Sequence, residues 1–527
     1  MMVLSRMKNV QVLKSSWNLV RFRSTTAIPA DSLFVDETIK DELASAKPYS
    51  EVPGPKPLPI LGNTYRLLPV IGQYKISDVA RISFLLYEMF GKIVALRGLI
   101  GRPDLLFVYD ADEIEKIYRQ EGPTPFRPSM PCLVKYKSEV RKDFFGRLAG
   151  VVGVHGEAWR EFRSKVQKPV LQPQTVKKYI DPIENITDDF INRMIDMLDS
   201  NRELPAYFDN ELHKWSLECI GQIALDVRLG CLNANLGSDS EPQKVIDAAK
   251  YALRNIGILE LKFPFWRYLP TTIWRNYVRN MDFFVEVCMK YINEALERLK
   301  TKDLTKEKDL SLVERILVME PDPKLACVLA LDLILVGIDT ISMAISSVLY
   351  QIATRPEEQE KIYAELKRVF PDPNEKLTAK KIDELQYLRA FIKEVFRLYS
   401  TVIGNGRTLQ KDTVISGYRI PKGTQLVFPT LVLGRMPEHV SNPEKFDPER
   451  WIKQTDENNI LHPFASLPYG HGPRMCLGRR FADLEMQILI SKLLRRYKLE
   501  YHHEPLEYQV TFMYAPDGDL KFRMVPR

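Results

Sequence analysis

One cysteine in a glycine-rich loop is the strongest candidate for chemistry in this sequence. Residues 469–485 read YGHGPRMCLGRRFADLE, which places Cys476 between Gly472 and Gly478, before a helix expected to begin near Arg479. A thiolate that holds a metal needs backbone N–H groups directed at its sulfur, and glycines let the chain approach that closely. The positive end of the following helix dipole favours the anionic sulfur. The segment therefore predicts a thiolate ligand of the kind that haem iron takes from a single cysteine.

A second set of residues could hold the carboxylates of a bound macrocycle. Trp159 and Arg163 stand four residues apart in an amphipathic helix expected to open at Gly156, so they share one helix face. Two buried carboxylates need cationic or N–H donors, because an unpaired buried charge is costly. Arg474, two residues before the cysteine, could meet one of them. Taken alone, the Trp-x-x-x-Arg spacing is also compatible with packing and a solvated charge.

The loop sequence Tyr-Gly-His-Gly-Pro-Arg-Met-Cys-Leu-Gly resembles the haem-binding loop of the cytochromes P450. Tyr469 stands where that family usually has Phe, which keeps the aromatic ring and adds a hydroxyl. The resemblance extends from about Pro53 to the C-terminal end and is nearest to the animal mitochondrial clan, in particular its insect members. It implies a mainly α fold with a small β region, haem b (iron protoporphyrin IX) as the cofactor and O2 as the co-substrate.

The resemblance assigns roles to the candidate residues. It makes Cys476 the axial ligand of the haem iron, and it makes propionate donors of Trp159, Arg163, Arg407 and Arg474. Residues 336–342, VGIDTIS, look like the oxygen-activation motif of the family. In that motif Thr340 hydrogen-bonds the distal oxygen and Asp339 relays protons to it, while Gly337 lets the helix open locally. In isolation, an Asp-Thr pair could equally serve helix capping or packing.

A structural network and a docking face are also implied by the family pattern. Glu394 and Arg397 lie three residues apart on one helix face, and the resemblance joins Arg450 to them in a buried network that braces the cysteine loop. Four basic residues match or extend positions that mitochondrial P450s use to dock an acidic ferredoxin. These are Arg389, Lys393, Arg479 and Arg480. Electrostatic steering of an acidic carrier would follow, although a solvated helix face has the same charge pattern.

The longest apolar stretch, residues 325–353, must position the Asp-Thr pair. Hydropathy alone would permit a membrane span, but Asp332, Asp339 and clustered hydroxyl residues favour a buried central helix. Residues 92–98 and 104–109 predict a hairpin followed by a helix over 111–119. A second strand pair is expected at 418–420 and 425–428, around Pro421-Lys-Gly423. The proline-rich segment 53–63 resembles the entry to the P450 fold.

Composition and charge narrow the class of protein. The chain has 527 residues with 45% hydrophobic and 27% charged, which is ordinary for a globular protein. The net charge of +7 is spread along the chain and favours an acidic partner or an anionic membrane over nucleic acid. The six cysteines show no CxxC spacing and no disulfide framework, which indicates a reducing compartment. We expect one domain over residues 50–527.

The first residues read as a targeting segment. Residues 1–30 carry five basic residues and several hydroxyl residues, and no acidic residue precedes Asp31. This composition is typical of a mitochondrial transit peptide, which we place at residues 1–23, followed by a polar lead-in over 24–49. A disordered basic tail is the alternative. No apolar run long enough for a membrane anchor occurs in residues 1–30.

The resulting hypothesis is a haem-thiolate monooxygenase, peripheral on the matrix side of the inner mitochondrial membrane. Its electrons would come one at a time from an adrenodoxin-like ferredoxin, whose reductase takes them from NADPH. The substrate would be a lipophilic small molecule, either a xenobiotic such as an insecticide or a hormone-like steroid. An isomerase or dehydratase with the same thiolate, and a haem sensor without catalysis, remain as alternatives.

Overall fold

The computed structural model describes residues 37–68, 72–75, 78–128, 130–148, 150–234, 236–261, 265–302, 310–320, 322–452, 460–510 and 513–527. Contacts divide the chain into residues 1–47 and 48–527, and each unit is described by itself. The described part of the first unit contains helix α2 (Glu37–Ser45). The predicted transit peptide, 1–23, and residues 24–36 of the lead-in lie outside the described residues.

The second unit is mainly helical, as predicted. Its α-helices are α3 (Val79–Phe90), α4 (Ala111–Gln120), α5 (Pro131–Lys135), α6 (Lys142–Phe145), α7 (Gly156–Leu171), α8 (Pro173–Lys177), α9 (Ile180–Asp196), α10 (Phe208–Ala224), α11 (Glu241–Leu261), α12 (Thr272–Lys300), α13 (Leu312–Met319), α14 (Pro323–Ala353), α15 (Pro356–Val369), α16 (Ala379–Asp383), α17 (Gln386–Leu398), α18 (Thr430–Leu433) and α19 (Arg479–Leu494). Short helices are η1 (Tyr49–Glu51), η2 (Thr64–Leu67), the π-turn η4 (Tyr136–Val140), η5 (Phe265–Arg267), η7 (Pro448–Trp451) and η8 (Gly472–Arg474).

The small β region consists of separate sheets. The largest has the order β2 (Ile93–Leu96), β3 (Leu105–Val108), β7 (Gln425–Phe428) and β4 (Asn405–Thr408). A hairpin joins β5 (Thr413–Ile415) to β6 (Tyr418–Ile420), β8 (Tyr497–Glu500) pairs with β11 (Arg523–Pro526), and β9 (Glu507–Val510) pairs with β10 (Tyr514–Asp517). Strand β1 is Lys47–Pro48. The prediction of a mainly α fold with a small β region is therefore confirmed.

The hairpin of β2 and β3, followed by α4, forms where the sequence predicted it. The second predicted pairing is wrong, although both of its strands exist. Strand β6 pairs with β5 across a tight turn in which Ser416 and Gly417 have φ of 51° and 78°. Such left-handed positions suit a two-residue hairpin turn. Strand β7 instead pairs in parallel with β3, which is distant in the sequence, and antiparallel with β4.

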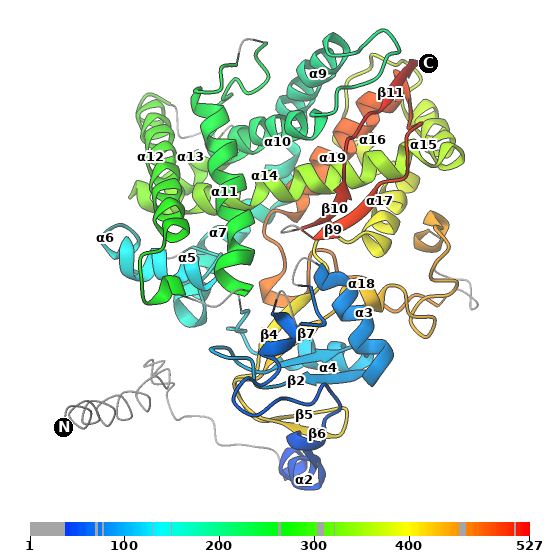
Figure 1. The fold of residues 1–527 in the computed structure, drawn as a ribbon. Coiled ribbons are helices and arrows are strands. Elements are labelled where there is room, and N and C mark those ends of the chain that lie inside the picture. The colour runs from blue at the N-terminus through cyan, green and yellow to red at the C-terminus, as the bar shows by residue number, and fades with distance from the viewer. Residues whose placement is uncertain are drawn as a thin grey trace, which may run out of the picture. The chain divides into compact units, whose positions relative to one another are not determined.

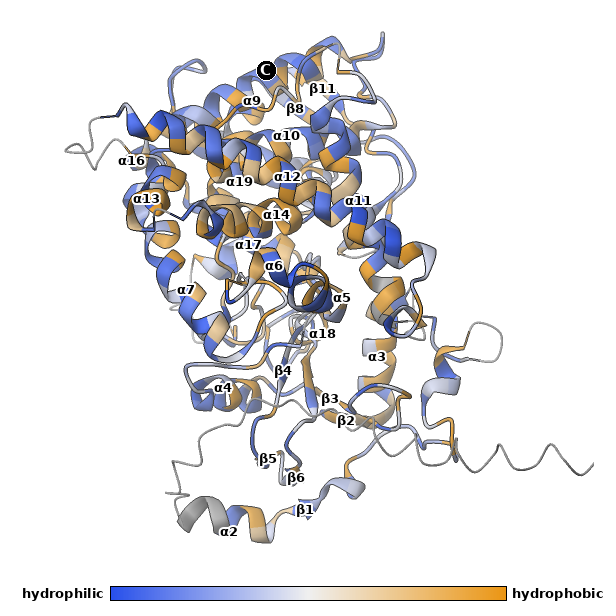
Figure 2. Cartoon of the chain, turned by 90° about the vertical axis from the view of Figure 1, so that its left-hand side faces the viewer, coloured by the Kyte–Doolittle hydropathy of each residue, from blue (hydrophilic) through white to orange (hydrophobic). Residues whose placement is uncertain are grey.

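Helix α14 is the central element of the helical part, and Figure 1 shows it among α10, α11, α13, α17 and α19. It begins with Pro323, and the Asp322 side chain accepts from the Lys324 N–H as an N-cap. In the described residues it is the one helix long and apolar enough to cross a membrane, but 78% of its most apolar window is buried inside the protein. Figure 2 shows it as mostly hydrophobic among helices with mixed faces. The prediction of a buried central helix is confirmed.

Two hydrophobic cores hold the second unit together. The larger one is formed by helices α7 to α17 and α19, with α14 contributing more than a dozen buried side chains. The smaller one joins α3 and α4 to the sheet that contains β2, β3 and β7. The segment from Phe464 to Leu477, which contains Cys476, contacts both cores, because Phe464 belongs to the smaller core and Leu477 to the larger one.

Candidate active site

The cysteine loop approaches α19 through tight backbone turns. Gly470 and Gly472 have φ of 71° and 73°, a region that favours glycine, and a Cβ on Gly472 would lie 2.5 Å from Glu121 Oε1. The Cys476 N–H donates to the Tyr469 carbonyl oxygen at 2.9 Å. The Gly478 N–H at the start of α19 donates toward the sulfur and lowers the pKa of the thiol. The predicted N–H donor near the sulfur is thus present.

The sulfur of Cys476 is accessible but lies deep in the protein. Its side chain is exposed, whereas the five other cysteines are buried. Burial is nevertheless the largest influence on its thiol and raises its pKa, while the cations Arg127 and Arg163 lower it. An accessible sulfur at that depth, with cations around it, suits a thiolate ligand approached from one side by a large buried group.

Backbone carbonyl oxygens accept hydrogen bonds from Arg163 and Arg474 and fix both guanidinium groups. Arg163 on α7 donates to the Met475 carbonyl at 2.9 Å, although its Nε has no hydrogen-bond partner in the described part of the chain. Arg474 donates to the carbonyls of Pro125 at 3.0 Å and Val154 at 2.7 Å. Its guanidinium lies 3.8 Å from the centre of the Trp159 ring, so Trp159 positions this arginine.

Two more arginines complete the cluster. Arg407 on β4 forms an ion pair with Glu121 and donates to the His471 carbonyl at 3.2 Å. Arg127, in the loop after α4, was not predicted, because a single arginine between Phe126 and Pro128 carries no motif. We assign Arg127 to the cluster because its positive charge lowers the pKa of both Cys476 and Arg474.

The electrostatics of the cluster call for an anion. Burial and the charges of Arg127, Arg407 and Arg163 lower the pKa of Arg474 to about 9. Burial also lowers the pKa of Arg127 and of Arg163. Glu121 pairs with one of these four cations. Two carboxylates placed among the other guanidinium groups would relieve the repulsion, which is what the propionates of a haem provide. The donor set therefore fits haem.

Asp339 and Thr340 lie next to each other on α14 but make different contacts. The Thr340 hydroxyl donates to the carbonyls of Val336 at 2.8 Å and Gly337 at 3.2 Å. Asp339 is 1% exposed, and its Oδ1 lies 3.3 Å from His213 Nε2 on α10. Helix α14 runs from Pro323 to Ala353 through Gly337, and the Thr340 hydroxyl bonds back to carbonyls of the preceding turn.

The structural network behind the loop has the predicted geometry. Arg397 donates to both carboxylate oxygens of Glu394, at 2.9 and 2.7 Å. Arg450 Nε reaches Glu394 Oε1 at 3.1 Å, and Trp451 Nε1 reaches Oε2 at 2.9 Å. Glu394, Arg397 and Arg450 are all buried. Each of these polar groups has a partner within the network, which is the arrangement expected of residues that hold the fold together.

Three of the four predicted docking residues gather around one carboxylate. Arg479, Lys393 and Arg389 all lower the pKa of Asp483, which burial raises. The Asp483 carboxylate also accepts a hydrogen bond from the Tyr469 hydroxyl at 2.6 Å. Lys393 is exposed and lies 5.5 Å from the Trp451 ring. The contacts of the fourth residue, Arg480, do not tie it to this group.

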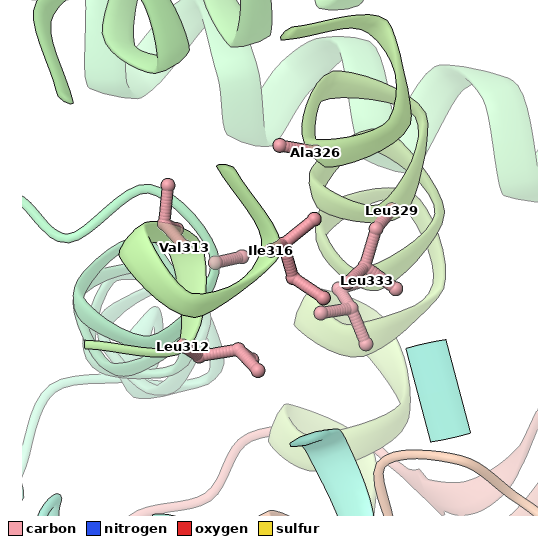
Figure 3. A pocket seen from close by; sticks show the side chains of 7 residues that line it. Leu312, Val313, Ile316, Ala326, Leu329 and Leu333 are labelled. Atoms are coloured by element: carbon pink, nitrogen blue, oxygen red, sulfur yellow. The ribbon is translucent and has the colours of Figure 1, made fainter. Parts of the chain in front are cut away.

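Two other clusters are not part of the site. A cavity of about 10 Å³ between α13, α14 and the end of α10 is lined by apolar side chains such as Ile316 and Leu333, and Figure 3 shows it. It is too small and too apolar for a cofactor.

Asp112, Glu115 and His462 lie close enough to suggest a metal. However, His462 Nδ1 accepts from the Phe464 N–H at 3.1 Å, so its Nε2 carries a proton and faces the acids as a donor.

Comparisons with known proteins identify the family of this chain. The family described as "Cytochrome P450" matches residues 52–517. "Probable cytochrome P450 301a1, mitochondrial" of Drosophila melanogaster is 66% identical over 92% of this chain and 88% of its own length. "Probable cytochrome P450 49a1" of the same species is 45% identical over 98% and 90%, and "Cytochrome P450 CYP12A2" of Musca domestica is 31% identical over 92% of both. The chain belongs to the cytochrome P450 family of monooxygenases.

Proposed function

We propose that this P450 hydroxylates lipophilic small molecules in the mitochondrion with electrons from a ferredoxin. The observation that carries the proposal is the accessible Cys476 sulfur with the Gly478 N–H directed at it and four arginines around the loop. In this arrangement Cys476 ligates haem b, and Arg127, Arg163 and Arg474 receive the propionates. Trp159 holds Arg474 in place, and Arg407 supports the group through Glu121.

Bound haem supplies the activation of O2, and side chains of α14 supply the protons. Thr340 lies at the proposed oxygen site and can exchange its hydrogen bond to the Val336 carbonyl for one to an incoming oxygen. Asp339, the preceding residue, is buried and relays protons toward Thr340. Gly337 faces α10, where a Cβ would make an ordinary contact with Ile220 at 3.4 Å.

Electrons are proposed to arrive at the face of α17 and the start of α19. Arg389, Lys393 and Arg479 surround Asp483, and Arg480, which follows Arg479 in the sequence, is proposed to add charge to the same face. An acidic ferredoxin of the adrenodoxin type complements this surface, and its reductase draws electrons from NADPH. The mitochondrial names of the relatives support a donor of this type.

The mitochondrial location is proposed to be the matrix side of the inner membrane. Residues 1–23 act as the transit peptide, 24–49 as a polar lead-in, and 50–527 as the catalytic domain. Phe265, Tyr268 and Leu269 lie between α11 and α12 with more than half of each side chain exposed. Exposed aromatic and aliphatic residues at one loop suit contact with a lipid surface, from which a lipophilic substrate would enter.

The experiment is a pair of measurements on the haem-loaded protein. The reduced CO complex should show the long-wavelength Soret band of thiolate-ligated haem, and Cys476→Ser should lose it. The wild-type protein should then oxidise a member of a panel of steroids and lipophilic xenobiotics, with ferredoxin, its reductase and NADPH all required. Labelled O2 should place one atom in the product.

Each alternative has its own outcome. Product formed without any reductant would identify an isomerase or dehydratase. Tight haem binding without turnover on any member of the panel would identify a sensor. Either result would contradict the proposal.

A further inference from the structure

The feature that the proposed mechanism does not use is His213, which faces Asp339 from α10. Both side chains are almost completely buried, with 4% and 1% of their surfaces exposed. His213 Nε2 and Asp339 Oδ1 are 3.3 Å apart, yet neither atom has a hydrogen bond in the described part of the chain. The second carboxylate oxygen, Oδ2, also has none. Two buried polar groups placed side by side in this way need a proton between them.

The tautomer of the ring follows from its other side. His213 Nδ1 lies 2.8 Å from the Asp209 carbonyl oxygen, which can only accept, so Nδ1 carries a hydrogen. If the imidazole were neutral, Nε2 would then present a lone pair to the Asp339 carboxylate, and the two would repel. The contact is favourable when one further proton lies between Nε2 and Oδ1, on either atom. The pair is therefore built to hold one proton.

The surroundings of the pair fix α10 against α14 and lead to an exposed residue of α10. Ser216, one turn along α10, donates to the Ile338 carbonyl at 3.1 Å and fixes α10 against α14 beside Asp339. Lys250 on α11 is within electrostatic reach, since Asp339 and Asp209 raise its pKa while burial lowers it more. Lys250 also donates to Asn210 at 2.9 Å. Asp209, whose carbonyl oxygen accepts from His213 Nδ1, is exposed, so His213 lies between an exposed residue of α10 and Asp339 of the oxygen-activation motif.

We propose that His213 is a positioning residue that reloads Asp339 with protons during the reaction. The pair holds one proton between Nε2 and Oδ1, and that proton leaves from Oδ1 toward Thr340. The carboxylate and the neutral imidazole, whose Nδ1–H stays on the Asp209 carbonyl oxygen, then repel each other until one proton from solvent returns to Nε2, so that one proton enters for each one delivered. The inference rests on the proposed function, because it assumes that Asp339 supplies protons to oxygen.

The test uses His213→Gln in the haem-loaded protein. The amide keeps most of the side-chain size and can donate to Asp339, but it cannot hold the extra proton. We expect an unchanged CO spectrum and substrate affinity, about a tenfold lower rate of product formation, and more of the reductant released as peroxide. The solvent isotope effect, which is the ratio of the rates of product formation in H2O and D2O, should be larger for this variant than for the wild-type protein. His462→Gln, a half-buried histidine elsewhere, is the matched control and should behave as wild type.

Two further variants keep the test decisive. His213→Asn also lacks the extra proton and should repeat the result if His213→Gln folds poorly. Adding His213→Gln to Asp339→Asn should change product formation by less than about twofold, because the partner has already gone. A double-mutant cycle on urea unfolding should also show non-additive losses for the two residues.

The outcomes separate the two proposals. The role of His213 would be overturned if both His213 variants formed product at the wild-type rate and with the wild-type yield per reductant. It would also be overturned if the effects of His213→Gln and Asp339→Asn on product formation were additive. Neither result would contradict the proposed monooxygenase activity. Absence of the thiolate Soret band or of ferredoxin-dependent product in the wild-type protein would instead overturn the proposed function itself.

Discussion

A buried carboxyl in the middle of α19 makes the stability of this protein depend on pH in a way that one substitution should remove. Glu485 is 2% exposed, and its Oε2 has no hydrogen-bond partner in the described residues. Burial raises the pKa of Glu485 from 4.5 to about 8. The folded protein therefore keeps this proton between about pH 4.5 and 8, whereas the unfolded chain releases it.

The sign and size of the effect follow from this difference. The stability that protonated Glu485 contributes is fully present below about pH 4.5, its pKa in the unfolded chain, and is lost as the pH rises toward about 8, its pKa in the folded protein. The loss is about 1.4 kcal/mol per pH unit, or about 5 kcal/mol over the whole window. Glu485→Gln keeps the shape and has no proton to lose. Its free energy of unfolding relative to wild type should rise by about 1.4 kcal/mol per unit between about pH 5 and 7.5 and level off above about pH 8.

The assay is urea unfolding of the haem-loaded proteins across this pH range. Glu184→Gln on α9 is the matched control, because Glu184 is equally buried but pairs with Lys492 at 2.9 Å and accepts from the Leu377 N–H. Removing a paired carboxylate should destabilise by about 3 kcal/mol at neutral pH, with no gain as the pH rises. Parallel pH profiles for Glu485→Gln and wild type would refute the reasoning.

Three further predictions test the site. Thr340→Ala should uncouple the enzyme, so that NADPH consumption continues while peroxide replaces most of the product; unchanged product yield per NADPH would remove Thr340 from proton delivery. Replacing Arg389 and Lys393 together with Glu should weaken ferredoxin binding at least about tenfold at low salt without altering the CO spectrum; equal affinity at low salt would move the docking face elsewhere. Tyr469→Phe should cost about 1–3 kcal/mol in urea unfolding, because half-buried Asp483 loses its hydroxyl donor, and a loss below that range would mean that another group satisfies the acid.

The sequence predicted the parts of this protein that depend on local spacing. The turn-rich loop around Cys476 and the helix of Glu394 and Arg397 could be predicted because their residues lie within one or two turns of each other. The same holds for α14, whose apolar length and flanking prolines mark its bounds. Arg450 joined the network only through the family resemblance, since more than fifty residues separate it from Glu394.

The parts that sequence reasoning missed depend on contacts between distant segments. Strand β7 contains only four residues, and its pairing with β3 rather than β6 is decided by the sheet, not by its own pattern. Arg127 and His213 belong to no local motif, and their partners lie more than a hundred residues away. A lone arginine or a lone histidine in a helix is most often an ordinary surface or core residue. Only the fold identifies these two as neighbours of the site.

The arginine cluster shows how the fold prepares a site that is completed by its cofactor. Arg127, Arg163, Arg407 and Arg474 come from four separate segments, and backbone carbonyls hold Arg163 and Arg474 in fixed positions. The lowered pKa values of Arg127, Arg163 and Arg474 mean that the protein without haem must keep these charges together at a cost. A dianionic cofactor removes that cost, so its binding free energy adds directly to the stability of the folded state. Folding and haem incorporation should therefore be strongly coupled, with the cysteine loop, which Arg163 and Arg474 both anchor, as the segment that gains most.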